Sequence, residues 1–161
     1  MLKIIFDIIM LLIVVNGAPI IAARVFRTHA EQPVDLGVCL SDGQPLFGSS
    51  KTWRGLLAAL LFCALCGPLL GFTMLFSLVF ASLAMTGDLF SSFIKRRKGL
   101  APSDQCLGLD QLPEAFLPCI YAVAVTGLPW WWAVLLPLLF MLLELLVSRP
   151  LYWLKIRKRP Y

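Results

Sequence analysis

The sequence predicts an all-α integral membrane protein, folded as a bundle of about five transmembrane helices. Of its 161 residues, 60% are hydrophobic and only 14% are charged, whereas a soluble domain carries about 25% charged residues. The apolar residues form continuous runs instead of alternating with polar ones, which excludes an outer-membrane barrel. Because lipid offers no hydrogen bonds to the backbone, helices are the remaining way to cross it.

Five apolar runs define the expected spans. Helices of about 20 residues are needed to cross a bilayer, and the runs cover residues 4–23, 56–72, 74–94, 115–126 and 130–147. The first run follows Lys3 but contains Asp7, so we expect a retained helix and not a cleaved signal. Since the connections consume the rest of the chain, residues 1–161 are predicted to form a single transmembrane domain.

The basic residues predict the orientation of the bundle. All of the 14 Lys and Arg residues except Lys3 lie in two long loops, at about 24–54 and 95–113, or in the carboxyl-terminal tail from Arg149. With five spans these three segments share one face of the membrane. The positive-inside rule places that face in the cytoplasm and the amino terminus outside. We therefore expect a multi-pass protein of the cell membrane, with any chemistry on the cytoplasmic side.

Asp88 is the most informative residue, because it lies inside the third span near its cytoplasmic end. An Asp within a membrane helix costs at least about 2.5 kcal/mol, so it usually faces a cavity or the bundle interior. Ser92 and Lys95 follow at positions that return to nearly the same helix face. We expect a metal, phosphate or proton site here. The alternative is an Asp that pairs with Lys95 or Asn16 for packing alone.

The second long loop offers partners for Asp88. The basic residues 95–98 are typical of a membrane anchor, but Lys95 and Arg96 also stand where they could bind phosphate oxygens. A second carboxylate could come from Asp104, Asp110 or Glu114, of which Asp110 stands at the expected start of the fourth span. Two such carboxylates, with Asp88 as one, would suit Mg²⁺. The alternative role for Asp110 is a helix cap.

The first long loop contains a Gly/Ser turn that leads into the second span. Two serines separate Gly48 from Lys51, which excludes a Walker phosphate-binding loop. Free backbone N–H groups at a helix start, with cations beside them, still suit an anion. Lys51, Thr52 and Arg54 are therefore candidate phosphate-binding residues. The alternative is that Thr52 caps the helix while the cations reach the membrane surface.

Several of these segments together resemble the signature of the CTP-dependent phosphatidate cytidylyltransferases, the CDP-diacylglycerol synthases. They are Gly87-Asp88, the run from Ser92 to Arg96, and Leu109-Asp110-Gln111. The small size, the five expected spans and four further motifs are closer to the CDP-archaeol synthase branch; these motifs run from Asn16 to Pro19, from Pro33 to Gly37, from Asp42 to Gly43 and from Gly48 to Gly55. The archaeal pattern continues after Asp-Gln-Leu with Asp-Phe, whereas this chain has Pro113-Glu114. The role of Glu114 and the identity of the lipid therefore stay open.

The resemblance implies an enzyme of phospholipid biosynthesis that transfers CMP from CTP to a membrane lipid phosphate and releases pyrophosphate. The lipid would be phosphatidate-like or an archaeal-type ether lipid phosphate, and no nucleic-acid partner is expected. It implies Mg²⁺ held by Asp88 and Asp110, with Asn16 lining the site. Asp88, Lys95 and Asp110 are the predicted catalytic residues. The predicted phosphate-binding residues are Lys51, Thr52, Arg54, Ser92, Lys95 and Arg96.

Two other functions fit a small basic membrane bundle. A transporter or channel would use Asp88 as an intramembrane relay. A non-enzymatic envelope assembly protein would use its basic loops only to orient the bundle. The gathering of candidate carboxylates at the cytoplasmic end, beside a Gly-rich loop, favours the enzyme.

Overall fold

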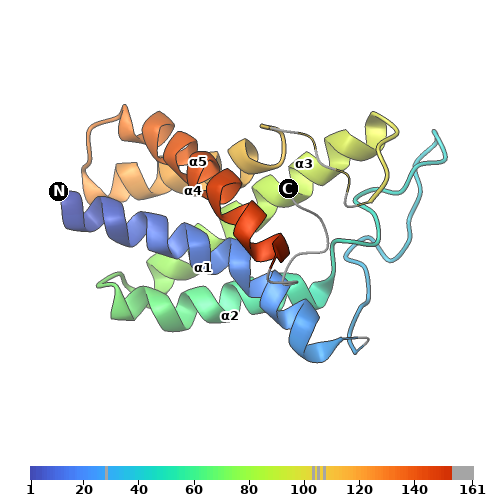
Figure 1. Ribbon diagram of the computed structural model, residues 1–161, viewed down its shortest axis with the longest axis horizontal. Helices are drawn as coiled ribbons and strands as arrows, with labels where there is room; N and C mark the ends of the chain where they lie inside the picture. The colour runs from blue at the N-terminus through green and yellow to red at the C-terminus, as the bar shows by residue number, and fades with distance from the viewer. Residues whose placement is uncertain (28, 103, 105, 107, 154–161) are drawn as a thin grey trace.

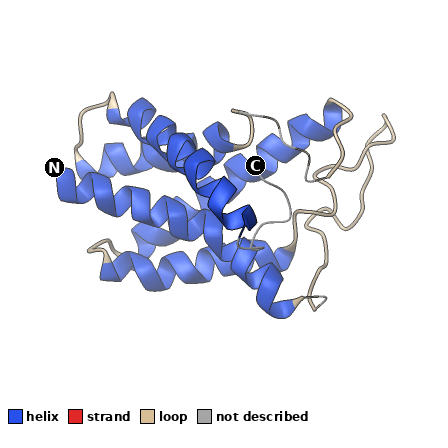
Figure 2. Ribbon diagram, in the orientation of Figure 1, coloured by secondary structure: helices blue, strands red, loops and turns tan. Residues whose placement is uncertain are grey.

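The computed structural model contains five helices over the residues that it describes, which are 1–27, 29–102, 104, 106 and 108–153. Side chains are described as far as residue 146, so the side chains of the basic tail residues lie outside the described part. The helices are α1 (Leu2–Phe26), α2 (Trp53–Leu69), α3 (Met74–Arg97), α4 (Gln111–Thr126) and α5 (Trp132–Trp153). Figure 2 shows the helical character of the whole bundle, which confirms the all-α prediction.

The helix bounds differ from the expected spans at several ends. α4 begins at Gln111, four residues before the apolar run at Ala115, and α5 continues beyond Val147 to Trp153. α1 and α3 also extend past their apolar runs into basic residues. The loops are therefore shorter than predicted, at residues 27–52 and 98–110. The expected bounds were wrong because hydropathy marks the apolar part of a helix, whereas its hydrogen bonding continues into polar flanking turns.

Two of the five helices, α1 and α3, are long and apolar enough to span a membrane by length and composition. α2 and the first part of α5, Trp132–Leu146, are apolar but shorter. Leu11, Leu12, Phe80 and Leu136 are fully buried in the common core. These helices fit a membrane-embedded bundle, in which apolar side chains cover the outside as well as the core.

Consecutive helices pack against one another, and α1 also contacts α3, α4 and α5. Figure 1 shows the two long loops together at one end of the bundle, while the amino terminus and the two short turns lie at the other. We call these the loop end and the turn end. The long loops thus share one face of the bundle, as the charge pattern predicted.

α3 and α4 come into backbone contact beside Asp88. Gly87 is buried, and a Cβ built on it would overlap the carbonyl oxygen of Pro113 and crowd the Cα of Glu114. Only glycine allows two helices to approach this closely. The contact sets the start of α4 next to the one carboxylate of α3.

The first long loop is held against the ends of α2 and α3. The Val34 N–H donates to the Lys51 carbonyl at 2.8 Å, beside an isolated β-bridge between Pro33 and Thr52. Farther along the loop, Arg97 of α3 binds both carboxylate oxygens of Asp42 at 2.7 and 2.8 Å. The loop therefore has a defined path that returns to the bundle directly before α2.

Candidate active site

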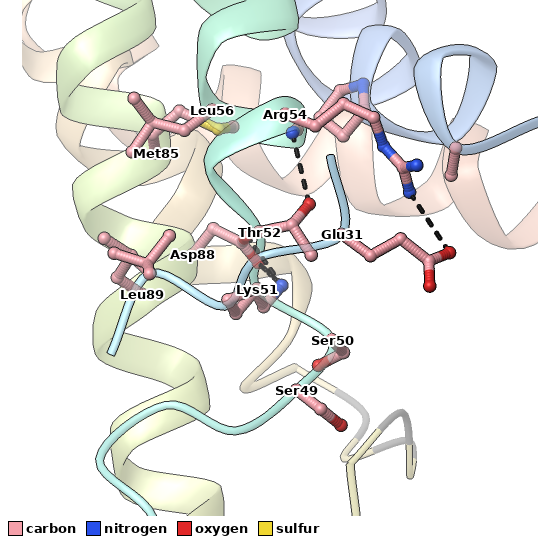
Figure 3. A pocket seen from close by; sticks show the side chains of 14 residues that line it. Glu31, Ser49, Ser50, Lys51, Thr52, Arg54, Leu56, Met85, Asp88 and Leu89 are labelled. Atoms are coloured by element: carbon pink, nitrogen blue, oxygen red, sulfur yellow. Dashed lines mark hydrogen bonds and ion pairs between the residues drawn. The ribbon is translucent and has the colours of Figure 1, made fainter. Parts of the chain in front are cut away.

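A cavity of about 500 Å³ lies at the loop end, between the first long loop and helices α1, α2 and α3. Residues 49–52 and Arg54 form one wall, and Met85, Asp88 and Leu89 of α3 form the opposite wall. Pro19 of α1 and Glu31 are among the other lining residues. Figure 3 shows the side chains of both walls and that of Glu31. The volume is within the usual range for a small-molecule site.

An ion pair between Lys51 and Asp88 spans this cavity. The Lys51 Nζ lies 2.6 Å from each carboxylate oxygen of Asp88, and each side chain is only 24% exposed. Burial disfavours the charged amine, but the Asp88 carboxylate outweighs it and holds the pKa of Lys51 above its usual value. The alternative that Asp88 pairs with Lys95 or Asn16 is wrong, because its partner comes from the first loop.

Lys95 forms a second ion pair, with Asp110. Its Nζ lies 2.5 Å from Asp110 Oδ1 and donates to the Asp104 carbonyl at 3.0 Å. The other oxygen of Asp110 accepts from the Cys106 N–H at 2.8 Å. Asp110 occupies the N-cap position of α4, yet its side chain caps no helix N–H. The carboxylate binds a cation and a loop amide instead.

Further acidic side chains lie within electrostatic reach of these pairs. The charge of Lys51 interacts with Glu114 and Asp110 as well as with Asp88. Glu114 interacts in turn with Asp88 and with Glu144 of α5. Glu144 was not among the predicted site residues, although an ionisable residue within an apolar run is a usable signal. Glu114 and Glu144 are thus two further acidic groups near the predicted aspartates.

The donor set fits a magnesium ion shared with a substrate. Among the described residues, no three His, Cys, Asp or Glu side chains are gathered so as to hold a metal ion by themselves. Mg²⁺ is commonly bound through one or two carboxylates together with phosphate oxygens and water. Asp88 and Asp110 are both 24% exposed, and Lys51 lies in the field of both. Their oxygens suit that ion, with the lysines balancing their charge.

The structure divides the predicted phosphate-binding residues into two groups. Lys51, Thr52 and Arg54 line the cavity. Thr52 also caps α2, since its Oγ1 accepts from the Gly55 N–H at 3.2 Å, so the capping alternative is confirmed for this residue. The Arg54 Nη1 donates to the carbonyls of Arg27 and His29 at 2.7 Å each. Arg54 is thus anchored to the end of α1.

The second group lies away from the cavity lining. Ser92, Lys95 and Arg96 are buried along α3. The Nη2 of Arg96 donates to the Ala101 carbonyl at 3.0 Å. Asn16 is partly buried on α1, with a buried Nδ2 that lacks a hydrogen-bond partner among the described residues. Conversely, the cavity is also lined by Ser49, Ser50 and Glu31, which the sequence did not predict as site residues.

Comparison with known proteins gives a consistent result. The family model described as "CarS-like: CDP-archaeol synthase" matches residues 1–161. The CDP-archaeol synthase of Pyrococcus furiosus is 37% identical over 107 residues, which are 60% of this chain and 64% of that protein. The one from Thermofilum pendens is 36% identical over 104 residues, or 62% of this chain and 51% of that protein. The matches thus span between about half and just under two thirds of these relatives.

A solved structure agrees with these matches. That structure is described as one of "an intramembrane enzyme for archaeal membrane lipids biosynthesis". It superposes with a TM-score of 0.76 and 29% sequence identity, over 88% of this chain and 90% of that one. Because the family model covers the whole sequence, the chain belongs to the CarS-like CDP-archaeol synthase family.

Proposed function

We propose that the protein is a CTP-dependent cytidylyltransferase that transfers CMP to a membrane lipid phosphate and releases pyrophosphate. The observation that carries this proposal is the cavity crossed by the Lys51–Asp88 ion pair, at one end of a bundle with membrane-length helices. A cation and a carboxylate in one partly enclosed space are the groups that phosphoryl and nucleotidyl transfer requires. Family membership and the intramembrane structural neighbour support the same activity.

The nucleotide phosphates would bind along residues 49–52. This segment ends at the amino terminus of α2, where backbone N–H groups and the helix dipole favour an anion. Lys51 would move from Asp88 to the phosphate oxygens when CTP enters, and Asp88 would then be available to a cation. Arg54 adds positive charge from the same wall. Binding would therefore exchange one ion pair for two charge-assisted contacts.

Asp88 and Asp110 are the residues that would hold Mg²⁺, with Lys95 keeping Asp110 in place. The bound ion would supply charge neutralisation at the triphosphate. Lys51 would orient the phosphates, and the side chains of Met85 and Leu89 would restrict water on the opposite wall. These contributions are positioning and electrostatic stabilisation, which supply most of the catalysis in phosphoryl transfer.

The reaction needs no general base on the protein. An oxygen of the lipid phosphomonoester, already ionised near neutral pH, would attack the α-phosphorus of CTP. The bond between the α-phosphorus and the bridging oxygen to the β-phosphorus would break, and pyrophosphate would leave with that electron pair. The polar residues described around the cavity are Lys, Arg, Ser, Thr, Asp and Glu, which suits charge stabilisation more than proton transfer.

The lipid would approach from the side of the bundle. A second cavity of about 580 Å³, lined almost entirely by apolar side chains, lies between the end of α1 and the first half of α2. Arg54 lines both this cavity and the polar one. Hydrocarbon chains would occupy the apolar cavity while the phosphate reaches Arg54. The chain could be phosphatidate-like or an archaeal-type ether lipid.

We further propose that all five helices cross the cell membrane, with the amino terminus outside and the loop end in the cytoplasm. The distribution of Lys and Arg supports this orientation. CTP, a cytoplasmic nucleotide, would then reach the site directly.

The test is an activity assay with the purified protein in lipid nanodiscs. CTP labelled at the α-phosphorus and Mg²⁺ would be combined with phosphatidic acids and archaeal-type ether lipid phosphates in separate reactions. We expect label in the lipid fraction with at least one lipid, and none with CTP labelled at the γ-phosphorus. Folded protein that labels no lipid in the panel would contradict the proposal and favour a transporter or an assembly protein.

A further inference from the structure

Asp35 of the first long loop binds three backbone amides with one carboxylate. Its Oδ2 accepts from the N–H groups of Phe47 and Gly48, both at 2.8 Å. Its Oδ1 accepts from the Gly37 N–H at 3.1 Å. The residue is only 6% exposed. Although burial acts in the opposite direction, these amides hold the pKa of Asp35 below its usual value. Asp35 thus joins two turns of the loop.

The Arg96 side chain of α3 lies beside the same glycine. A Cβ built on Gly48 would lie 3.5 Å from Arg96 Cδ and 3.6 Å from its Nη1. The Arg96 side chain is among the largest fully buried ones, and its Nη2 bonds to the Ala101 carbonyl. Gly48 also has a φ of +92°, a conformation that favours glycine. Gly48 is therefore fixed by Asp35, by Arg96 and by its own backbone.

The position of Gly48 determines where Lys51 points. The Lys51 N–H donates to the Gly48 carbonyl at 3.2 Å, which closes a turn between the two residues. The Lys51 carbonyl accepts from Val34, the neighbour of Asp35. Residues 49–52 between these contacts form the wall of the cavity. Both ends of that wall are thus tied to the segment around Asp35.

The backbone beside Asp35 has an uncommon conformation that agrees with this role. Leu36 has a φ of 51° and Gly37 a φ of 79°. A non-glycine residue in the left-handed region is uncommon, and such strain persists where the surroundings impose it. The contacts of Asp35 with Gly37, Phe47 and Gly48 provide that constraint.

We propose that Asp35 and Arg96 are positioning residues that fix Gly48 and so aim Lys51 at Asp88. This inference rests on the proposed function for its catalytic consequence. It also gives Arg96 a different role from the phosphate binding that the sequence predicted. Neither side chain needs to touch the nucleotide, since both act through the backbone of the loop.

The first test compares Asp35→Asn with Asp42→Asn by hydrogen exchange of the wild-type and variant proteins in nanodiscs. Asn cannot accept from all three amides, so exchange at Phe47 and Gly48 should become about tenfold faster or more. Asp42 lies in the same loop, is exposed and bonds to Gln44 and Arg97, so its variant should leave amides 47 and 48 unchanged. Unchanged exchange in Asp35→Asn would overturn the proposal, whatever the activity of the protein.

The second test asks whether Asp35 acts through Lys51. Asp35→Asn should weaken CTP binding about tenfold. Gly48→Ala should have a similar effect, because a side chain at a φ of +92° strains the backbone of the same loop directly. In a Lys51→Ala background, Asp35→Asn should weaken binding less than twofold further, because the group that it positions is gone. If the double variant instead loses the product of the two separate fold-losses in CTP binding, Asp35 acts independently of Lys51 and the proposal is overturned.

The third test separates the two roles of Arg96. As a positioning residue, Arg96→Met should speed exchange at Gly48 and weaken CTP binding together, and Arg96→Lys should partly restore both. If Arg96→Met weakens CTP binding while exchange at residues 47–51 stays at the wild-type rate, Arg96 is a phosphate ligand and its part of the proposal is wrong.

Discussion

The Lys3–Asp7 ion pair at the turn end and the Lys51–Asp88 ion pair at the loop end differ in kind. At the turn end, Lys3 and Asp7 lie four residues apart on α1 at 2.8 Å, where the Lys3 side chain is 77% exposed and the Asp7 side chain 8% exposed. At the loop end, Lys51 and Asp88 lie 37 residues apart, and both are 24% exposed. The first pair belongs to one helix, whereas the second joins a loop to a helix across a cavity.

This difference has an energetic consequence. The Lys3 ammonium stays in water, and a pair at i and i+4 on a helix surface is worth about 0.2–0.5 kcal/mol. A largely buried pair must offset the loss of water around both charges, and removal of one partner leaves the other uncompensated. Such a pair contributes little net free energy to the stability of the fold. It is well suited to a site where a ligand takes over one of the partners.

The largest effect should come from Asp88→Asn, compared with Asp7→Asn. Asp88→Asn removes the carboxylate that faces Lys51 and the predicted metal ligand, so CMP transfer should fall by at least about 100-fold. Asp7→Asn should leave transfer within about twofold of wild type. Labelled-lipid assays at matched amounts of folded protein measure both. Equal activity of the two variants would remove Asp88 from the site.

A second comparison uses the two glycines at helix contacts. A Cβ on Gly87 would overlap the backbone of α4, while a Cβ on Gly67 would overlap the Ser77 side chain at the turn end. Both Ala variants should lose about 1–3 kcal/mol of stability from overpacking. Gly87→Ala should also displace the start of α4, with Asp110 and Glu114, and lower kcat between about 10- and 100-fold.

Thermal unfolding and steady-state kinetics in nanodiscs separate these outcomes. Gly67→Ala serves as the control for destabilisation, and its kcat should stay near that of wild type below its unfolding temperature. If both variants lose stability equally and Gly87→Ala keeps full kcat, the close contact of α3 with α4 has no role in positioning the site.

The fold could be predicted in outline because hydropathy reports the apolar helices directly. Their ends could not, since polar residues such as Gln111 and Arg97 continue the helical hydrogen bonding. Likewise, Asp88 stood out as an acid in a membrane helix, and Lys51 stood out in a Gly/Ser turn. Their pairing could not be read from the sequence, because it depends on how residues 33–50 fold back onto α3.

The limits were greater for residues that act through the backbone. Asp35 lies in the Pro33–Gly37 motif that carried the family resemblance, but the sequence assigned it no role, because its three amide partners are defined only by the folded loop. Arg96 follows Lys95 in a basic run that predicts phosphate contact equally for both. In the structure the two side chains have different neighbours, because Lys95 forms an ion pair with Asp110 and Arg96 lies beside Gly48.

A smaller effect is expected from the second ion pair. Lys95→Ala removes the partner of Asp110 and should lower transfer about tenfold, the cost of one charge-assisted hydrogen bond. Lys98 lies three residues on, is exposed and ends α3. Lys98→Ala should leave transfer unchanged, and assays of the two variants in parallel measure the difference. Equal losses would indicate that both lysines act only as a general membrane anchor.

The smallest effect concerns the pH dependence of stability. The pKa of Asp35 is lowered from 3.8 in the folded protein, so its carboxylate contributes stability above that pH, and the contribution is lost as pH falls through the lowered pKa. The unfolding temperature of Asp35→Asn should be a few degrees below wild type from pH 5 to 8. The gap should narrow below about pH 3.8. A gap that is constant down to pH 2.5 would mean that the carboxylate charge is not what holds the loop.

The central claim is that CTP binds at the loop end by taking Lys51 away from Asp88. A structure of the wild-type protein determined with CTP and Mg²⁺ tests this claim most directly. We predict that the triphosphate lies along residues 49–52, with the Lys51 ammonium within hydrogen-bond distance of a phosphate oxygen and separated from Asp88. A nucleotide bound elsewhere, with the Lys51–Asp88 pair still at 2.6 Å, would contradict the account.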